Sequence, residues 1–359
     1  KILAFALCLT ALPLAAQRGG SAQERLRLFE QYLARRAASV TRQNLADVTS
    51  AAVWKKRRPE VRRQLLYMLG LDPMPPRTAL NARITGRIER AGYRVENVVL
   101  ESMPRLYVTG NLYLPSRKTG KLPAVIYLCG HSPDPAGAKA YYQYNGVALA
   151  RLGYAVLMID PLHFGELPGV HHGLHNLGMW YWLSLGYTPA GPEAWNVVRA
   201  LDYLETRPEV DSGRVAVTGN SGGGSSTWYA AAIDERIAVA VPMCSTWTAE
   251  DQAARDAVKE NCDCIYFPNT YLLDFPAVGA LIAPRPLKML SAMRDPMFPP
   301  GGYHEVYRRN RLIYELEGAG ERVSEYDHDA GHGQTAPSFR KVAYEWINQI
   351  GRASCGVRV

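Results

Sequence analysis

The stretch 215–224 constrains the fold of this chain more than any other. It reads Val-Ala-Val-Thr-Gly-Asn-Ser-Gly-Gly-Gly, an apolar β-type run that leads into Ser221 between glycines. A strand followed by Gly-x-Ser-x-Gly is typical of a nucleophile elbow, a tight strand-to-helix turn that exposes a serine hydroxyl. Gly219 and Gly223 suit such a turn because they lack a Cβ. An ordinary Gly/Ser loop is the alternative, and the helical pattern at 222–233 favours the elbow.

Strand and helix patterns alternate through most of the chain. Apolar runs predict buried strands at 123–128, 155–160, 215–220, 237–242, 287–292 and 322–326. Helical spacing separates or follows them at 136–152, 193–205, 222–233, 303–317 and 338–350. An alternating pattern at 82–114 predicts antiparallel strands ahead of them. We therefore expect residues 81–352 to form an α/β-hydrolase fold with a doubly wound, mostly parallel sheet.

Two regions lie outside this alternation. Residues 23–80 show helical spacing at 23–36 and 51–69 and predict an N-terminal helical cap. Residues 161–192 are rich in His, Gly, Trp and Tyr and are too long for an ordinary connection, which predicts a lid-like insertion. The basic residues at 55–58 and 62–63 lie on the cap pattern. Since no nucleic-acid recognition motif accompanies them, we interpret them as a solvated helix face and expect no nucleic-acid partner.

The N-terminal residues 1–22 predict a signal peptide. An apolar run at 2–16 follows Lys1 and leads into small residues, with cleavage expected near Ala16 or Ala22. The run is shorter than the roughly 20 apolar residues that a membrane-spanning helix needs, and no other stretch approaches that length. We expect a secreted or periplasmic protein with no membrane span in the mature chain. At 47% hydrophobic and 21% charged residues, the composition excludes disorder and a fibrous repeat.

Five of the six cysteines lie beyond the predicted signal peptide. In an oxidising compartment Cys262 or Cys264 could pair with Cys244, while buried free thiols at Cys129 and Cys244 are the alternative. The one-residue spacing of Cys262 and Cys264 is not the usual zinc spacing. The histidines of the 161–192 insertion (His163, His171, His172 and His175) include two that are one helical turn apart, but no zincin pattern accompanies them. We expect neither a metal nor a cofactor.

An elbow serine requires a base and an acid from later strand ends. The turn after 287–292 carries Asp295, and the turn after 322–326 carries His332. Ser221, Asp295 and His332 follow the chain order of α/β hydrolases, so we predict them as the catalytic triad. Rival side chains fit this order less well: His328 belongs to a strand end, and the acids Asp251, Asp274, Asp327 and Asp329 do not directly follow the penultimate strand.

Further side chains are candidates around the serine. Acyl transfer needs donors for an oxyanion, and we expect the main-chain N–H groups of Gly222 and His131 to form the oxyanion hole. The alternative is that 130–133 is only a turn. Trp180, Tyr181 and Trp182 are candidate substrate-binding aromatics, because aromatic faces can stack on sugar rings, although local packing is the alternative.

Five segments resemble one known group of proteins. They are Gly219-Asn220-Ser221-Gly222-Gly223, Arg207-Pro208-Glu209-Val210-Asp211, the stretch 281–287 (Leu-Ile-Ala-Pro-Arg-Pro-Leu), Asp295-Pro296 and Gly331-His332-Gly333. In these the chain resembles secreted bacterial α/β hydrolases of the acetyl xylan esterase-like and dienelactone hydrolase-related group. That resemblance implies a serine esterase without cofactors, acting on acylated plant polysaccharides through Ser221, Asp295 and His332. The chain differs in having Cys-Gly-His-Ser at 129–132 and in lacking the Gly-Cys-Ser-Arg elbow of glucuronoyl esterases.

Three functions are compatible with these residues. The first is a secreted serine carboxylic ester hydrolase that removes acetyl or methyl esters from carbohydrate through an acyl-enzyme. The second is a peptidase of the prolyl-oligopeptidase type, for which the N-terminal region is too short to form the usual propeller. The third is a non-catalytic carbohydrate-binding protein on a hydrolase scaffold, against which the intact triad argues.

Overall fold

The computed structural model describes residues 21–117, 120–132, 134, 136–255, 261–333 and 337–353. The predicted signal peptide, 1–22, lies outside these residues except for its last two positions, and Cys355 lies outside them as well. Among the described helices, none is both long enough and apolar enough to cross a membrane.

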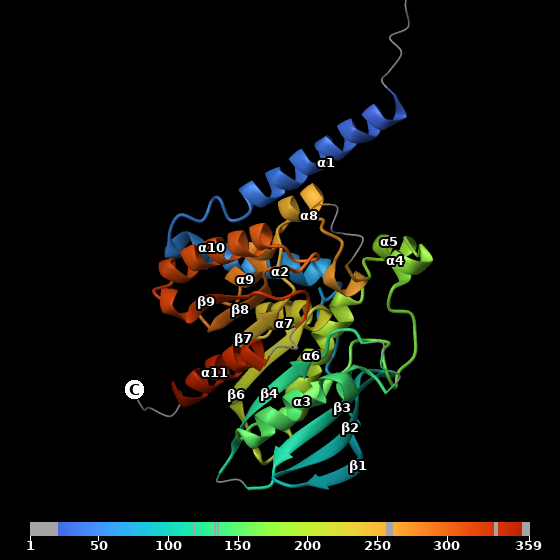
Figure 1. The fold of residues 1–359 in the computed structure, drawn as a ribbon, viewed down its shortest axis with the longest axis vertical. Coiled ribbons are helices and arrows are strands. Elements are labelled where there is room, and N and C mark those ends of the chain that lie inside the picture. Colours follow the sequence, from blue (N-terminus) through green and yellow to red (C-terminus); the bar gives the residue numbers. More distant parts are fainter. Residues whose placement is uncertain are drawn as a thin grey trace, which may run out of the picture.

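A nine-stranded sheet forms the centre of the molecule (Figure 1). Its strands are β1 (Arg83–Arg90), β2 (Tyr93–Met103), β3 (Leu106–Pro115), β4 (Leu122–Leu128), β5 (Ala155–Ile159), β6 (Val210–Asn220), β7 (Ile237–Met243), β8 (Leu287–Ala292) and β9 (Val323–His328). The spatial order is β1-β2-β3-β5-β4-β6-β7-β8-β9. Pairing is antiparallel from β1 to β5 and parallel from β5 to β9. The predicted α/β-hydrolase fold with a mostly parallel sheet is confirmed.

Helices cover both faces of the sheet. They are α1 (Ala22–Gln43), α2 (Ala51–Met68), α3 (Ala138–Arg151), α4 (Gly173–Leu177), α5 (Tyr181–Ser184), α6 (Ala190–Glu205), α7 (Gly222–Ile233), α8 (Ala249–Arg255), α9 (Phe275–Ala280), α10 (Pro300–Leu316) and α11 (Pro337–Ala353), with short 3-10 turns η2 (Asp263–Ile265) and η3 (Gly320–Arg322). One core cluster joins α2, α6, α7, α9 and α10 to the sheet, and a second joins α3 and α11 to its other face.

The central strands are apolar on both faces because both faces are covered. Along β4, Ile126 packs into the first core cluster, whereas Val125 and Tyr127 pack into the second. Since successive side chains of a strand point to opposite faces, a strand buried on both sides reads as a continuous apolar run. That is the pattern by which these strands were predicted.

The N-terminal helices differ in how they contact the rest of the chain. In α2, Trp54 and Leu65 are fully buried in the first core cluster. Arg58 of α2 donates to the carbonyl of Leu281 at 3.1 Å, and Arg62 donates to the carbonyl of Ile233. The prediction that this basic run is simply a solvated face was therefore wrong for these two arginines, because they satisfy carbonyl groups near the ends of other helices.

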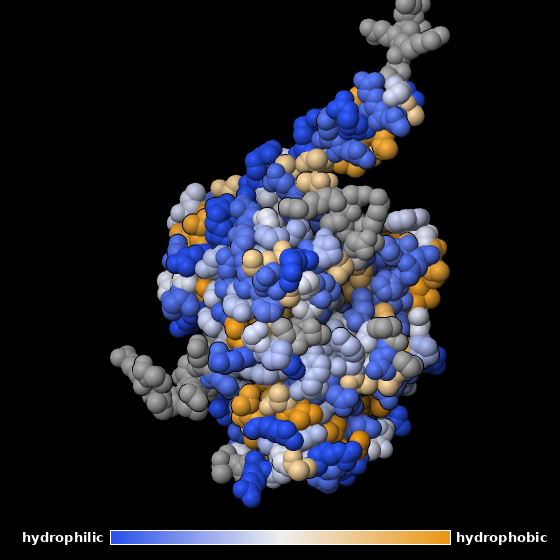
Figure 2. Space-filling view, in the orientation of Figure 1, coloured by the Kyte–Doolittle hydropathy of each residue, from blue (hydrophilic) through white to orange (hydrophobic). Residues whose placement is uncertain are grey.

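By contrast, α1 leaves much of its apolar side uncovered. It lies against α8 at one end, where Thr41 donates to Asp274 at 2.6 Å. Hydrophobic side chains show on its surface in Figure 2, and Phe29 is 56% exposed. The division into a cap at 23–80 and a catalytic domain at 81–352 remains a prediction. Within it, α2 packs into the same hydrophobic core as the main sheet.

The strand order places the functional loops at one edge of the sheet. β4 lies between β5 and β6, so the chain direction across the sheet reverses at this point. Ligands bind in open parallel sheets at the carboxyl ends of strands beside such a reversal. The loop after β4 carries His131, and the turn after β6 carries Ser221.

Candidate active site

The turn after β6 has the geometry of a nucleophile elbow. Ser221 has φ 78° and ψ −115°, a backbone conformation that L-residues rarely adopt, and α7 begins at the next residue. A Cβ on Gly219 would stand 2.5 Å from the carbonyl oxygen of Leu128. The strand, turn and helix are therefore packed too closely for a side chain at that position. The Ser221 side chain makes no capping bond to α7, which leaves its hydroxyl available.

Three side chains meet at this turn. His332 Nε2 lies 3.0 Å from Ser221 Oγ, and His332 Nδ1 lies 2.6 Å from Asp295 Oδ2. The other Asp295 oxygen accepts backbone N–H groups of Met297 at 2.9 Å and Phe298 at 3.3 Å. Asp295 is only 3% exposed, so these bonds fix its position. The structure thus brings together the serine, histidine and acid that the sequence selected.

The rival side chains lie elsewhere. His328 packs its ring near Phe339, with 5.9 Å between ring centroids. Asp327 pairs with His304 at 3.3 Å, and Asp329 pairs with Arg294 at 3.0 Å. Asp274 binds Thr41 near α1. Each of these groups already has another structural partner.

A pocket of about 470 Å³ opens beside Ser221. Its lining residues are His131, Ser132, Tyr141, Tyr142, Tyr144, Asn220, Ser221, Asn261, Cys262, Ile265, Met297, His332 and Gly333. This volume is in the range of small-molecule binding sites. The tyrosines come from α3, a helix that the sequence predicted without indicating which of its residues face the serine. Three closely spaced tyrosines just after the β4 loop were the only available signal.

The structure places both predicted oxyanion-hole residues beside the elbow. Gly222 is the first residue of α7, where backbone N–H groups lack partners within the helix. A Cβ on Gly222 would stand 3.1 Å from His131 Nε2, so the two residues are in close contact. The His131 ring stacks on Phe164, with centroids 4.7 Å apart and planes 11° apart. The contribution of the two main-chain amides to catalysis remains a prediction.

The predicted aromatic triplet does not form a single surface. Trp182 is only 9% exposed and packs edge-on against Tyr187, with ring centroids 4.9 Å apart. Trp180 and Tyr181 are 65% and 58% exposed. None of the three is among the residues that line the Ser221 pocket. Their part of the insertion, α4 and α5, forms a projection whose hydrophobic surface shows at the right edge of Figure 2. Local packing explains Trp182, and a substrate contact for the other two remains a prediction.

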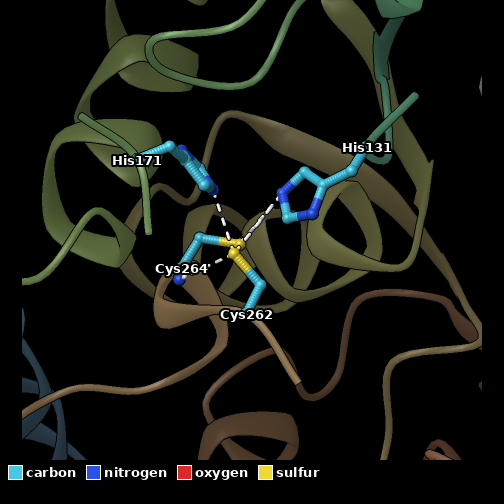
Figure 3. Close-up of side chains that lie close together, drawn as sticks. All are labelled: His131, His171, Cys262 and Cys264. Carbon is cyan, nitrogen blue, oxygen red and sulfur yellow. Dashed lines mark hydrogen bonds between the residues drawn. The ribbon is translucent and has the colours of Figure 1, made fainter. Parts of the chain in front are cut away.

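A second group of reactive side chains lies beside the elbow, next to Gly222 (Figure 3). His131, His171, Cys262 and Cys264 direct ring nitrogens and sulfurs towards one another. His171 Nε2 lies 3.0 Å from Cys262 Sγ. His131 Nε2 lies 3.5 Å from Cys262 Sγ and 3.6 Å from Cys264 Sγ. Sequence reasoning considered Cys262 with Cys264 and His171 with His175 separately, because it could not know that the fold joins members of both pairs.

The pKa values of Cys262, Cys264 and His171 in this cluster differ strongly from their ordinary values. Burial opposes ionisation of Cys262, but hydrogen bonds with Cys264, His131 and His171 hold the pKa of its thiol well below the ordinary value. Burial and the adjacent Cys262 sulfur raise the pKa of Cys264 well above it. Burial would lower the pKa of His171, yet its bond to Cys262 raises this pKa to about 9. Groups with such shifts frequently mark functional sites.

The four described cysteines, Cys129, Cys244, Cys262 and Cys264, are all free and buried. The alternative in which Cys244 pairs with Cys262 or Cys264 is therefore wrong for this structure. Cys244 instead lies beside Asp295 and His332. Burial, followed by the nearby Asp295 charge, raises the pKa of the Cys244 thiol to about 12.

Comparisons with known proteins find sequence similarity to hydrolases and carbohydrate esterases. A family model described as "Glucuronyl esterase, fungi" matches residues 99–254. A Bacillus subtilis protein named as a hydrolase, YtaP, is 27% identical over 290 residues, which cover 78% of this chain and 95% of that protein. The 4-O-methyl-glucuronoyl methylesterase 1 of Wolfiporia cocos is 26% identical over 306 residues, covering 76% of this chain and 69% of that protein.

Solved structures show the same fold. Methylesterase BT1017 superimposes with a TM-score of 0.69 at 22% identity, covering 87% of this chain and 68% of that one. The glucuronoyl esterase from Solibacter usitatus has a TM-score of 0.64 at 17% identity, covering 85% of this chain and 94% of that one. Together with the strand order and the elbow, these matches show an α/β-hydrolase fold, and the chain is similar in sequence to carbohydrate esterases.

Proposed function

We propose that this chain is a secreted serine esterase that removes acetyl or methyl esters from plant polysaccharide. The observation that carries the proposal is the hydrogen-bonded row from Ser221 through His332 to Asp295, with distances of 3.0 and 2.6 Å. Distances of this size put nucleophile, base and orienting acid within reach of one another.

Each side chain then has a defined task. Ser221 Oγ attacks the ester carbonyl while His332 Nε2 accepts its proton. Asp295 holds His332 with Nδ1–H directed at its carboxylate and stabilises the imidazolium that forms. The amides of Gly222 and His131 bind the oxyanion of the tetrahedral intermediate. His332 next returns the proton to the leaving alcohol, and water hydrolyses the acyl-enzyme by the same steps in reverse.

The pocket favours a neutral, ring-sized substrate. Tyr141, Tyr142 and Tyr144 supply aromatic faces, and among the described residues that line the pocket there is no lysine or arginine. The name of the Wolfiporia cocos relative specifies a methylesterase of a glucuronoyl group. A methyl ester of a sugar acid is neutral before hydrolysis, so it is the first substrate to test.

The residue after the elbow serine differs from that of glucuronoyl esterases, so further substrates belong in the test. Glucuronoyl esterases carry arginine after the serine of their Gly-Cys-Ser-Arg elbow, whereas this chain has Gly222. A Cβ at Gly222 would stand 3.0 Å from Cys264 Sγ and 3.1 Å from His131 Nε2, so an arginine there would have to displace both of these side chains. Acetylated xylan and methyl-esterified pectin therefore belong in the test beside methyl glucuronate esters.

The test measures release of methanol and acetic acid from these polymers by wild type and by Ser221→Ala. We expect one polymer ester to be hydrolysed by wild type, with a loss of about 10⁴-fold or more in the variant. Fluorophosphonate labelling of Ser221 separates an enzyme from a non-catalytic carbohydrate-binding protein. Cleavage of a proline-containing peptide without ester turnover would favour the peptidase hypothesis instead, and full activity of Ser221→Ala on p-nitrophenyl acetate would exclude the proposed mechanism.

A further inference from the structure

We propose that His131, His171, Cys262 and Cys264 form a Cys2His2 site for one Zn²⁺ ion, beside the nucleophile elbow. The four side chains come from three segments: the loop after β4, the 161–192 insertion and the segment around η2. Their candidate donor atoms all lie within 4.8 Å of one another. This site goes beyond the esterase function and does not depend on it.

The distances fit tetrahedral coordination. Zinc binds thiolate sulfur at about 2.3 Å and imidazole nitrogen at about 2.0–2.1 Å, so a sulfur and a nitrogen at a tetrahedral angle lie about 3.6 Å apart. His131 Nε2 lies 3.5 Å from Cys262 Sγ and 3.6 Å from Cys264 Sγ. The contact of His171 Nε2 with Cys262 Sγ, at 3.0 Å, is shorter and opens slightly when an ion enters.

The ring of His171 is held in the orientation that a ligand needs. Its Nδ1 lies 2.6 Å from the carbonyl oxygen of Leu162, to which it donates, so Nε2 is the nitrogen that faces the sulfurs and loses its proton when a metal ion binds. Leu162 is fixed in turn, because its N–H donates to Glu193 at 3.0 Å. Metal-bound histidines usually donate their other ring N–H to a carbonyl or carboxylate in this way.

The cysteine segment is also positioned independently of an ion. Asp263, between the two cysteines, accepts the backbone N–H groups of Leu174 at 2.7 Å and His175 at 3.1 Å. These bonds fasten the cysteine segment to the start of α4, two residues after His171. On the other side, stacking on Phe164 holds His131. The fold therefore presents the four donors before binding, which lowers the ordering cost of binding.

The types of ligand atom determine which metal ion this site prefers. Two thiolates and two imidazoles in a tetrahedral arrangement favour zinc over the hard cations Mg²⁺ and Ca²⁺, which prefer oxygen ligands. Two thiolates also neutralise Zn²⁺, which suits a place where Cys262 and Cys264 are 6% and 0% exposed. Four protein ligands leave no open position, so the ion has a structural function. It ties the insertion and the η2 segment to the loop that carries His131.

The experiment uses the full chain, reduced with a phosphine, stripped with a chelator and then equilibrated with ZnCl2 or CoCl2. We expect about one zinc per chain by elemental analysis after desalting, and with Co²⁺ the visible absorption and thiolate charge-transfer bands of a tetrahedral sulfur-containing site. Cys264→Ser and His171→Ala should each lower zinc retention at least tenfold under competition with a chelator. Cys129→Ser removes another buried cysteine outside the cluster and should retain zinc as wild type does.

Two results would overturn the site. One is wild-type protein that retains no zinc after reduction and gives an octahedral, sulfur-free Co²⁺ spectrum. The other is a Cys262→Ser/Cys264→Ser double variant that retains as much zinc as wild type. If a variant does not fold, the wild-type Co²⁺ spectrum decides, because thiolate charge-transfer bands require cysteine ligation. Neither measurement uses ester hydrolysis, so loss of the catalytic proposal leaves this test intact.

Discussion

The backbone of Gly223 passes so close to Leu128 that a Cβ on the glycine would stand 2.1 Å from the Leu128 carbonyl oxygen. This contact joins the first turn of α7 to the end of β4, and both contacting groups are backbone. Neither backbone segment can move without displacing β4 or α7.

Gly223→Ala should therefore damage both folding and activity. Forcing a methyl group against a backbone oxygen costs about 3 kcal/mol or more, since no side chain can rotate away. We expect a lower denaturation midpoint and a shifted Ser221. Gly213→Ala in β6, the strand that leads into the elbow, is the matched control, because a Cβ there meets only Asp211 Oδ1 at 3.4 Å. Equal midpoints for the two variants in a urea titration would contradict the close contact.

Asp295→Asn tests the orientation of His332. The amide of asparagine can donate to Nδ1 and so favours the wrong tautomer of the imidazole, in which Nε2 carries the proton. We expect kcat to fall by about 10⁴-fold with little loss of stability. Asp327→Asn is the control, because Asp327 pairs with His304, at 3.3 Å. Comparable kcat losses in both variants would show that Asp295 is not the orienting acid.

Most of the fold and the triad could be predicted because their signals are local or follow chain order. The apolar strands, the glycines of the elbow and the turns carrying Asp295 and His332 are each visible in a few neighbouring residues. Boundaries were less accurate where tertiary contacts extend an element. For example, β6 begins at Val210, ahead of the predicted 215–220 run, because Val210 pairs with Leu122 of β4.

The cluster of His131, His171, Cys262 and Cys264 could not be predicted from spacing. His131 and Cys262 are 131 residues apart, and His171 and Cys262 are 91 apart. The loop after β4, the 161–192 insertion and the η2 segment must pack together before these side chains meet. The direction of the α3 tyrosines was unpredictable for a related reason: Tyr141, Tyr142 and Tyr144 span most of a helical turn, yet all three reach the pocket.

Glu305 should make the stability depend on pH. Hydrogen bonds from Arg308, at 2.7 Å, and Arg309, at 2.6 Å, lower the pKa of this carboxyl despite partial burial. Because its pKa is lower in the folded chain than in the unfolded chain, the carboxylate stabilises the fold above the unfolded pKa. That contribution is lost as the pH falls through the folded pKa.

We therefore expect Glu305→Gln to lower Tm at pH 7 by on the order of 1 °C, since the pairs are partly exposed. Below the folded pKa of Glu305, wild type and Glu305→Gln should have the same Tm. Glu321→Gln changes a carboxylate that is 72% exposed and should leave Tm unchanged at either pH. If the Tm difference between wild type and Glu305→Gln grew as the pH fell, its sign would contradict this explanation.

The neighbouring tryptophans Trp180 and Trp182 should behave differently. The ring of Trp182 packs against Gly173 so closely that a Cβ on this glycine would stand 2.2 Å from the ring. Trp182 also packs on Tyr187. Trp182→Ala should cost about 3 kcal/mol locally and increase amide hydrogen exchange across 173–187. Trp180, at 65% exposure, should tolerate alanine within about 0.5 kcal/mol. If Trp180 contacts glycan, Trp180→Ala raises KM for a polymeric ester and leaves KM for p-nitrophenyl acetate unchanged. Equal hydrogen exchange in both variants would mean that Trp182 does not hold the insertion together.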